Sequence, residues 1–514
     1  MIKTIVSRFF IGISRKELGI CFFISLLVCL LGIKGESLWI DEGTTAWLAS
    51  HPTFYELLKT QMTFAGSESQ MPLYIWYAWA WGRLFGIKEL SLRFSNMPFL
   101  ILFLLSIQWA SRVLFRNSRA WVLAAAAPFV WFYLNEARPY LGVIAFSSIA
   151  TVAYLIYLVQ RDESKVIPWE CMIGIFLASS FCLLGAVLIP AMLITMCFEY
   201  KMDIVRWRRF LKSWAKPILF SLPFFAVLGG WFAWTLGKGY GGMKGTPGIF
   251  NLLFTIYEFL GFSGLGPPRN LIRSSTDWAS LSLPFLLPLA FGVIIWIGVL
   301  GLAAVKMFRE GITKILGILS FFLAIGITIF FFAAYNFHFR FWGRHLSPFI
   351  PAFILLLIAL VMLGHRRISA RYSQVMIWML MILWLASSLR LSFVADYKKD
   401  AYREAVKYAV TSAGSQGTIL WAAYLITGSY YGLHFSSYDL GGIYWPTKYH
   451  AIDARNWTEK QAEAVLRHAQ PPIIVVISKQ DLFDHLDSLK KALHKRRAQL
   501  VASPCAFSIY KVLR

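Results

Sequence analysis

The chain has 514 residues, of which 58% are hydrophobic and 15% are charged. A soluble domain carries about 25% charged residues, so this composition excludes an ordinary soluble protein. The apolar residues occur in runs of roughly 20, the length that crosses a bilayer. The formal net charge is +24. Because cytoplasmic loops and anionic lipid account for such a charge in a membrane protein, we expect membrane lipids and no nucleic acid among its partners.

Eleven apolar runs predict a polytopic α-helical membrane protein. Clusters of Lys and Arg follow alternate runs, and the densest cluster lies between residues 201 and 216. Under the positive-inside rule, this alternation puts the N-terminus in the cytoplasm and the loops 35–93 and 237–280 on the outer face. The predicted spans are 17–34, 94–111, 119–135, 140–159, 166–183, 185–199, 217–236, 281–304, 315–334, 346–363 and 374–393.

One apolar segment, MPLYIWYAWAWGRLFG at residues 71–86, has two interpretations. It is shorter than the roughly 20 residues of a span, and its Trp and Tyr residues favour the membrane interface. We therefore predict an interfacial helix in the first outer loop. The alternative is a twelfth span, which would move the basic cluster after residue 200 to the outer face.

The sequence pattern changes after residue 394. The segments AYREAVKYAV, TEKQAEAVLRHA and DLFDHLDSLKKALHKRR have helical spacing, whereas GTILWAAYL, PPIIVVIS and AFSIYKVL are typical of strands. Thr458 and Gln461 also form a capping-box pattern. These elements predict a membrane domain over 1–394 and an outward α/β domain over 395–514. Two roles stay open for this second domain, the binding of an acceptor and a structural cover.

Polar residues collect at the outward ends of several spans. Arginine holds phosphate through paired hydrogen bonds, and a carboxylate can take a proton from an attacking hydroxyl. Phosphate at the depth of the membrane surface implies a phospholipid or a polyprenyl-phosphate carrier. The residues are Asp41 and Glu42 in ESLWIDEGTTAWLAS, Glu136, Arg138 and Tyr140 in LNEARPYLG, Lys238 and Lys244 in the long loop, and Arg340, Arg344 and His345 in YNFHFRFWGRHLSP.

Simpler interpretations stand beside this one. Asp41 and Glu42 could cap a helix at the interface, since acidic residues favour helix N-termini. Arg138 could be an interfacial anchor, and Arg344 with His345 could extend to the interface from the end of a span.

The order of these motifs resembles the GT-C glycosyltransferases. The branch concerned contains the protein O-mannosyltransferases, the aminoarabinose transferase of lipid A and the RgtA-like transferases of family 39. Its second block commonly reads HPPLYY…W…LFG…E…LR.PS. This chain departs from it at Gln70 and Met71, and the late RY element corresponds to Arg344–His345. The residues retained in the second block are Pro72, Leu73, Tyr74, Leu84, Phe85, Gly86, Glu89, Leu92 and Arg93.

The resemblance implies an inverting glycosyltransferase of the bacterial inner membrane. Such an enzyme would move a single sugar from a polyprenyl-phosphate donor to a periplasmic acceptor, which is an envelope glycan, lipid A, lipopolysaccharide or protein. By the same resemblance, Asp41 would be the general base and Glu42 its support, and Arg138, Arg344 and His345 would hold the donor phosphate. Weaker candidates for substrate binding are Tyr74, Glu136, Tyr140, Lys238, Lys244 and Arg340. We expect no metal or other cofactor to be required.

A transporter or flippase for a lipid-linked saccharide is the alternative function. Transporters place polar binding residues near the bilayer midplane, whereas here the polar residues are predicted to lie at one face.

The phosphate that leaves in a transfer reaction is already acidic, so a single carboxylate at the acceptor is sufficient for sugar transfer. Glycoside hydrolases differ because they usually need two flanking carboxylates.

Overall fold

The computed structural model is mainly helical and describes most of the chain. The described residues are 14–64, 66–116, 120–160, 167–201, 203–239, 245–274, 282–310, 313–339, 341–362, 370–436, 444–484 and 486–512. The chain divides into two compact units, which are described separately.

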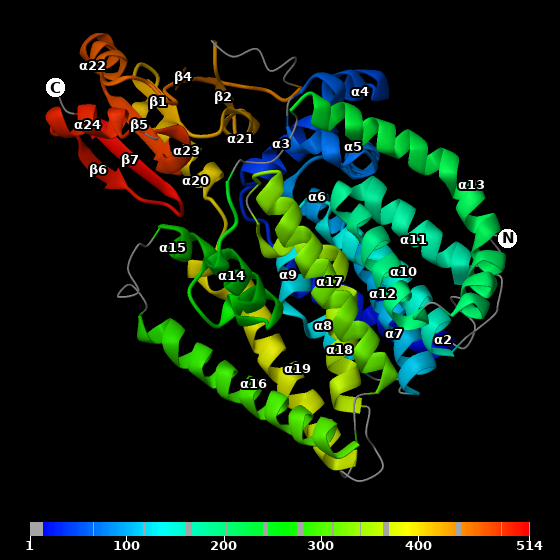
Figure 1. Ribbon diagram of the computed structural model, residues 1–514. Coiled ribbons are helices and arrows are strands. Elements are labelled where there is room, and N and C mark those ends of the chain that lie inside the picture. The colour runs from blue at the N-terminus through cyan, green and yellow to red at the C-terminus, as the bar shows by residue number, and fades with distance from the viewer. Residues whose placement is uncertain are drawn as a thin grey trace. The chain divides into compact units, whose positions relative to one another are not determined.

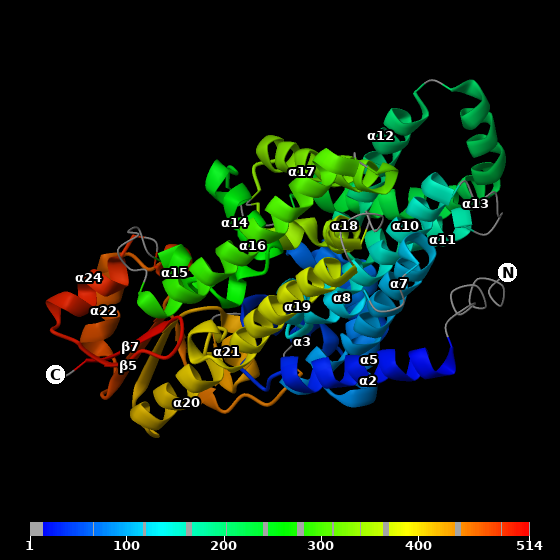
Figure 2. The ribbon, with the colours of Figure 1, turned by 90° about the horizontal axis from the view of Figure 1, so that it is seen from below.

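The first unit consists of Met1–Ile33, Phe64–Tyr74 and Arg93–Phe393. Its long helices run through much of Figures 1 and 2. The α-helices are α2 (Arg15–Gly32), α7 (Met97–Phe115), α8 (Val122–Ala126), α9 (Pro128–Leu134), α10 (Tyr140–Gln160), α11 (Ile167–Phe181), α12 (Leu188–Tyr200), α13 (Ile204–Gly237), α14 (Ile249–Phe259), α15 (Arg269–Ser274), α16 (Leu283–Glu310), α17 (Lys314–Asn336), α18 (Ile350–Met362) and α19 (Ala370–Phe393). Short 3-10 helices include η1 (Ser67–Gln70), η2 (Leu183–Val187), η3 (Phe262–Gly264) and η5 (Gly343–Phe349).

Eight helical segments in the described part of the chain are long and apolar enough to cross a membrane. They are Glu89–Phe115, Tyr140–Val159, Leu183–Tyr200, Ile204–Gly237, Leu283–Val305, Lys314–Asn336, Gly343–Met362 and Gln374–Phe393. Each coincides with a predicted span, which confirms a polytopic helical membrane protein.

Three predicted spans are not among these eight, so the total of eleven stays a prediction. α2 covers the first predicted span and α11, with 15 residues, covers 167–181. The run 119–135 is interrupted: α8 ends at Ala126 and α9 begins at Pro128. A proline lacks the backbone N–H that would continue the first helix. The basic cluster at 201–216 also differs from the predicted loop, because α13 already begins at Ile204.

Helix α10 is at the centre of the first unit. It packs against α7 and α11, and the three helices lie side by side in both ribbon views (Figures 1 and 2). Within Tyr140–Val159, 89% of the residues in an 18-residue window are buried. Gly174 allows the close approach of α11, since a Cβ atom there would lie 2.7 Å from the backbone nitrogen of Ala150.

The second unit consists of Lys34–Thr63, Ile75–Leu92 and Val394–Arg514. Val394 lies next to the predicted domain boundary, but the unit also contains most of the first outer loop, which had been predicted with the membrane domain. That loop forms α3 (Ile40–Ala49), α4 (Phe54–Thr63), α5 (Pro72–Phe85) and α6 (Glu89–Phe94). α5 coincides with the predicted interfacial helix and is not among the eight candidate spans.

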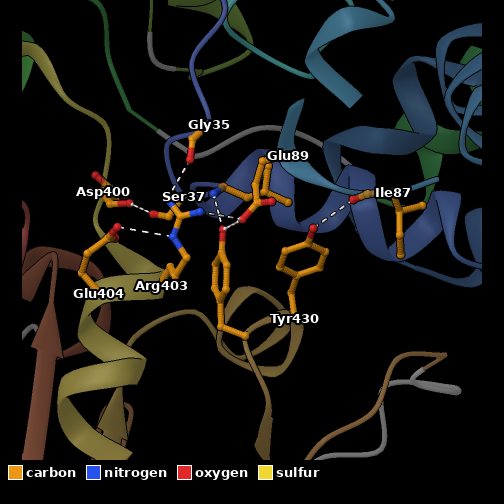
Figure 3. A network of polar contacts seen from close by, with 10 residues as sticks. Gly35, Ser37, Ile87, Glu89, Asp400, Arg403, Glu404 and Tyr430 are labelled. Carbon is orange, nitrogen blue, oxygen red and sulfur yellow. Dashed lines mark hydrogen bonds and ion pairs between the residues drawn. The ribbon is translucent and has the colours of Figure 1, made fainter. Parts of the chain in front are cut away.

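Hydrogen bonds explain why the outer loop groups with the C-terminal residues (Figure 3). Arg403 donates to the carbonyl of Gly35 at 2.7 Å and pairs with Glu89 at 3.4 Å. The Tyr431 hydroxyl donates to Glu89 at 3.1 Å, and Tyr430 donates to the carbonyl of Ile87 at 2.9 Å. These contacts connect residues more than 300 positions apart, so sequence pattern alone could not predict them.

The C-terminal part of the second unit contains a five-stranded sheet with the order β4-β1-β5-β7-β6. β1 pairs in parallel with β4 and β5, and β7 pairs antiparallel with β5 and β6. A second sheet pairs β2 with β3. The strands are β1 (Thr418–Ala422), β2 (Leu433–His434), β3 (Tyr449–His450), β4 (Ile452–Asp453), β5 (Ile473–Ser478), β6 (Gln499–Ala502) and β7 (Phe507–Val512).

Helices cover both faces of this sheet. Ile419 and Trp421 point to the face covered by α20 (Tyr402–Ala413) and α21 (Leu425–Tyr430). Leu420 and Ala422 point to the face covered by α22 (Glu459–His468) and α24 (Ser488–Lys495). The alternation follows from the two-residue period of a strand, and the predicted α/β domain is confirmed.

Two helix predictions in this part have different outcomes. Thr458 caps α22 in a capping box with Gln461, as predicted. The single helix predicted from DLFDHLDSLKKALHKRR is wrong, because α23 (Gln480–Phe483) and α24 are separate. The Asp484 carboxylate accepts from the backbone N–H groups of Leu489 and Lys490 at 3.0 and 3.1 Å. Asp487 adopts a left-handed φ of 54°, so the chain turns before α24 begins.

Candidate active site

The turn between α9 and α10 fixes the position of Arg138 in the first unit. Asn96 is fully buried, and its side-chain amide donates to the carbonyls of Tyr133, Leu134 and Glu136 at 3.3, 3.1 and 2.6 Å. These bonds satisfy carbonyls that the end of α9 leaves without helical partners. The backbone that carries Arg138 is therefore held by a buried side chain from the start of α7.

Arg138 forms a buried ion pair with Glu68. The guanidinium Nη1 atom lies 2.8 Å from the carboxylate, and the two side chains are 2% and 6% exposed. Glu68 lies in η1, and the indole of Trp231 in α13 donates to the neighbouring carbonyl of Ser69 at 2.7 Å. Arg138 is thus a deeply buried cation with a carboxylate partner, which argues against a role as a surface anchor.

A second arginine–carboxylate pair forms between Arg269 and Glu258. The two side chains approach to 2.6 Å, and the same carboxylate accepts from the backbone N–H of Gly343 at 3.1 Å. Burial is the largest influence on the pKa of Arg269 and lowers it, but Glu258, Tyr133 and Glu136 together outweigh burial, so the pKa of this guanidinium is raised. The pair therefore connects α14 and α15 to η5.

Aromatic rings surround the Arg269 guanidinium. Its central carbon lies 5.1 Å from the centre of the Phe132 ring and 5.8 Å from the rings of Phe254 and Trp342. Cations are attracted to the faces of aromatic rings at such distances. These rings limit the movement of the guanidinium.

Arg344 and His345 lie in η5, close to the same elements. The Arg344 guanidinium is 5.9 Å from the centre of the Tyr140 ring, and the Tyr140 and Tyr133 rings are 4.9 Å apart. The His345 Nδ1 atom accepts from the Trp342 backbone N–H at 2.9 Å. Because Nδ1 is an acceptor, the proton of the neutral ring is on Nε2.

These side chains form one group, which we call the arginine cluster. Arg138 and Arg344 both act electrostatically on the Cys182 thiol, and Tyr133 is within electrostatic reach of Arg269, Glu258, Glu136 and Tyr140. The cluster consists of Glu68, Tyr133, Glu136, Arg138, Tyr140, Glu258, Arg269, Arg344 and His345. Each guanidinium has five N–H donors, so one arginine can hold a carboxylate and a phosphate oxygen together.

Asp41 and Glu42 belong to the second unit and begin α3. Glu42 is fully buried and pairs with Lys399 at 3.6 Å. Asp41 is partly exposed. Both carboxylates lie in the first turn of the helix, where the helix dipole favours negative charge. The cap interpretation and a chemical role are therefore compatible, and the two residues are distinguished by burial.

The remaining predicted residues have varied positions. Tyr74 is buried in the first unit, with its ring 6.1 Å from that of Phe181. The Lys238 ammonium lies over the Trp234 ring at 4.4 Å. Lys244 and Arg340 lie outside the described residues. In the described part of the chain, no three His, Cys, Asp or Glu side chains are grouped to hold a metal ion, and metal independence stays a prediction.

The site prediction omitted four members of the arginine cluster, Glu68, Tyr133, Glu258 and Arg269. Glu258 had a recognisable signal, because an acidic residue inside the apolar helix IFNLLFTIYEF is costly unless it is paired or functional. Glu68 had no comparable signal, since its partner is 70 positions away.

Comparison with solved structures identifies the fold. ArnT from Cupriavidus metallidurans in the apo state matches with a TM-score of 0.53 and 13% identity, over 96% of this chain and 97% of that chain. The same protein bound to undecaprenyl phosphate matches with a TM-score of 0.50 and 14% identity, over 97% of this chain and 99% of that chain. The arabinofuranosyltransferase AftD from Mycobacteria reaches a TM-score of 0.38, which is too low to support a shared fold.

Sequence comparison adds nothing to this result: no family model matches the chain, and no curated protein matches it. At these identities the likeness to ArnT establishes the architecture alone. The eight candidate spans, the small C-terminal sheet domain and the match to ArnT agree with the fold that the motifs predicted. The chain therefore has the fold of the GT-C superfamily.

Proposed function

We propose that this chain is a membrane glycosyltransferase that takes a single sugar from a polyprenyl-phosphate donor. The observation that carries the proposal is the arginine cluster, in which Arg138 is buried, Arg269 is partly buried at 27% side-chain exposure, and their carboxylate partners lie at 2.8 and 2.6 Å. Guanidinium groups held at fixed positions suit the recognition of a phosphate. ArnT, which shares the fold, has a structure bound to undecaprenyl phosphate, and this supports a lipid phosphate as the ligand.

In the proposed reaction, an acceptor hydroxyl attacks the anomeric carbon of the sugar. The bond between that carbon and the phosphate oxygen breaks, and its electron pair goes to the polyprenyl phosphate. Arg138, Arg269 and Arg344 stabilise the charge that develops there, as preorganised cations do for a leaving group. The acceptor proton goes to the Asp41 carboxylate and then to water, and attack from the side opposite the phosphate inverts the configuration.

The carboxylates have separate roles in this proposal. Asp41 is partly exposed and is the general base, whereas the fully buried Glu42 supports it. We place the reaction at the outer face of a bacterial inner membrane, with the N-terminus in the cytoplasm and the C-terminal domain in the periplasm. The positive-inside pattern supports this orientation.

The decisive experiment compares envelope glycans, lipid A and glycoproteins by mass spectrometry with and without the gene. Loss of a single sugar residue would support the proposal and would name both donor sugar and acceptor. A truncated or unexported glycan, together with transport of a lipid-linked saccharide by the purified protein in vesicles, would instead support a flippase.

The base assignment has its own test, complementation with Asp41→Asn. We expect transfer to fall at least a hundredfold, because general-base catalysis contributes about 10²–10⁴-fold. Lys398→Met is the matched control, since Lys398 is exposed and lies in the same unit. Transfer at the wild-type rate by folded Asp41→Asn protein would refute the assignment.

A further inference from the structure

The acidic start of α3 is held by residues that follow the last membrane helix. A Cβ atom on Gly43 would lie 2.0 Å from the Thr427 hydroxyl, so α3 contacts α21 as closely as a glycine allows. One residue further on, the Thr44 and Tyr424 hydroxyls are 2.8 Å apart. Ile40 packs against the hydrophobic core that covers one face of the sheet. Both sides of Glu42 are therefore fixed against the C-terminal domain.

The charge of Glu42 is balanced by the segment that enters this domain. Its carboxylate is fully buried, and the Lys399 ammonium, at 10% side-chain exposure, lies 3.6 Å away. A buried carboxylate without a cation would be strongly disfavoured. Lys399 therefore places a positive charge beside the buried Glu42 carboxylate.

A second pair beside Lys399 holds the chain just before the acidic residues. Asp400 pairs with Lys479 at 2.6 Å, with side chains 4% and 12% exposed. The Lys479 ammonium also lies 5.3 Å from the centre of the Trp39 ring. The Ser37 hydroxyl donates to the Asp400 carbonyl at 2.6 Å, as Figure 3 shows. The segment 37–42 is thus attached on two sides to residues 399 and 400.

We propose that Lys399 is a positioning residue for the acidic pair and that the C-terminal domain is part of the catalytic apparatus. This inference depends on the proposed function, because it assigns Lys399 an effect on transfer through Glu42 and the start of α3. Asp41 follows Trp39 and Ile40 directly and precedes Glu42. Movement of Glu42 therefore changes the direction of the Asp41 carboxylate, while the arginine cluster belongs to the other unit and keeps its phosphate-binding residues.

The test uses full-length Lys399→Met, Lys399→Arg and Glu42→Gln/Lys399→Met, with Lys398→Met as control. Binding of undecaprenyl phosphate to purified protein is measured as Kd, and transfer is measured in the deletion strain as recovery of the missing sugar per folded enzyme. For Lys399→Met we expect Kd within twofold of wild type and transfer reduced at least tenfold. Lys399→Arg, which keeps the charge, should recover most of the transfer.

The double variant separates positioning from folding. Without the buried carboxylate charge it should accumulate as wild-type amounts of folded protein, and its transfer should still be at least tenfold low. Wild-type transfer by the double variant would show that Lys399 serves folding alone and would overturn the inference, as would wild-type transfer by folded Lys399→Met. If deletion of the gene removes no sugar, the proposed function fails, and that result is distinct from either outcome.

Discussion

Replacement of Glu68 by Gln tests whether the arginine cluster binds phosphate. The substitution keeps the size of the side chain and an oxygen that can accept from Arg138, but it removes the negative charge. Arg138 then remains buried, at 2% exposure, without the Glu68 carboxylate. The unliganded protein should lose stability, and an anion that enters the cluster should replace the missing charge.

The structure gives the size of this effect. At the observed 2.8 Å and an effective dielectric constant of roughly 20, the attraction is about 6 kcal/mol. The hydrogen bond from Arg138 to the remaining side-chain oxygen still contributes about 1 kcal/mol of stability. Removal of one partner from a buried ion pair costs about 3–5 kcal/mol. We therefore expect the unliganded variant to be less stable by about 3–5 kcal/mol.

Thermal unfolding with and without undecaprenyl phosphate is the assay. Ligand at a hundred times Kd stabilises a protein by about 2.7 kcal/mol, and a lower Kd increases the shift. Glu68→Gln should therefore show a lower Tm without ligand, a larger rise with ligand, and tighter binding than wild type. An uncharged polyprenol should produce neither change.

The matched control is Glu404→Gln, because Glu404 pairs with Arg403 at 3.4 Å with side chains 52% and 42% exposed. Exposed pairs contribute only about 0–1 kcal/mol, so this variant should behave as wild type. If Glu68→Gln lowers Tm but leaves the ligand-induced rise unchanged, the Arg138–Glu68 pair is structural and the reasoning is refuted.

Two further predictions concern Gly343 and His51. A Cβ atom on Gly343 would lie 2.1 Å from the Glu258 carboxylate, so Gly343→Ala should displace the Arg269–Glu258 pair and reduce transfer at least tenfold. Gly298→Ala is the control, because a Cβ atom there has open space around it, and it should not reduce transfer. Equal transfer rates for the two variants would refute the role of this pair. Burial lowers the pKa of His51. Below about pH 6.5 the unfolded chain therefore binds more protons than the folded chain, and stability should decrease as the pH is lowered. Tm measured between pH 8 and 5 checks this. His51→Gln should reduce this slope, and an unchanged slope would assign the pH dependence to other groups.

Much of the fold could be predicted from local pattern. Spans such as 140–159 follow from apolar runs of sufficient length, and the strand Ile473–Ser478 follows from a short apolar run after two prolines. The capping box of Thr458 was equally local. The single helix predicted from DLFDHLDSLKKALHKRR was wrong because Asp484 and Asp487 end one helix and start the next. Periodicity does not record such turns.

The candidate site could be predicted only in part. The sequence by itself determined that Glu136, Arg138, Tyr140, Arg344 and His345 lie at the ends of apolar runs, and the lengths of these runs predict that such ends lie at the membrane surface. It could not show that Arg138 pairs with Glu68, since the partners are 70 positions apart and nothing in either local pattern depends on the other.

Tertiary structure alone decided which charged side chains pair with each other and to which of the two units the first outer loop belongs. Lys399 lies beside Glu42, and Arg403 lies beside Gly35 and Glu89, although these residues are far apart in the chain. Hydrophobic periodicity is a property of neighbouring residues and can be read from sequence. The pairing of buried charges depends on which distant segments pack together, because each such charge needs a partner in the folded protein.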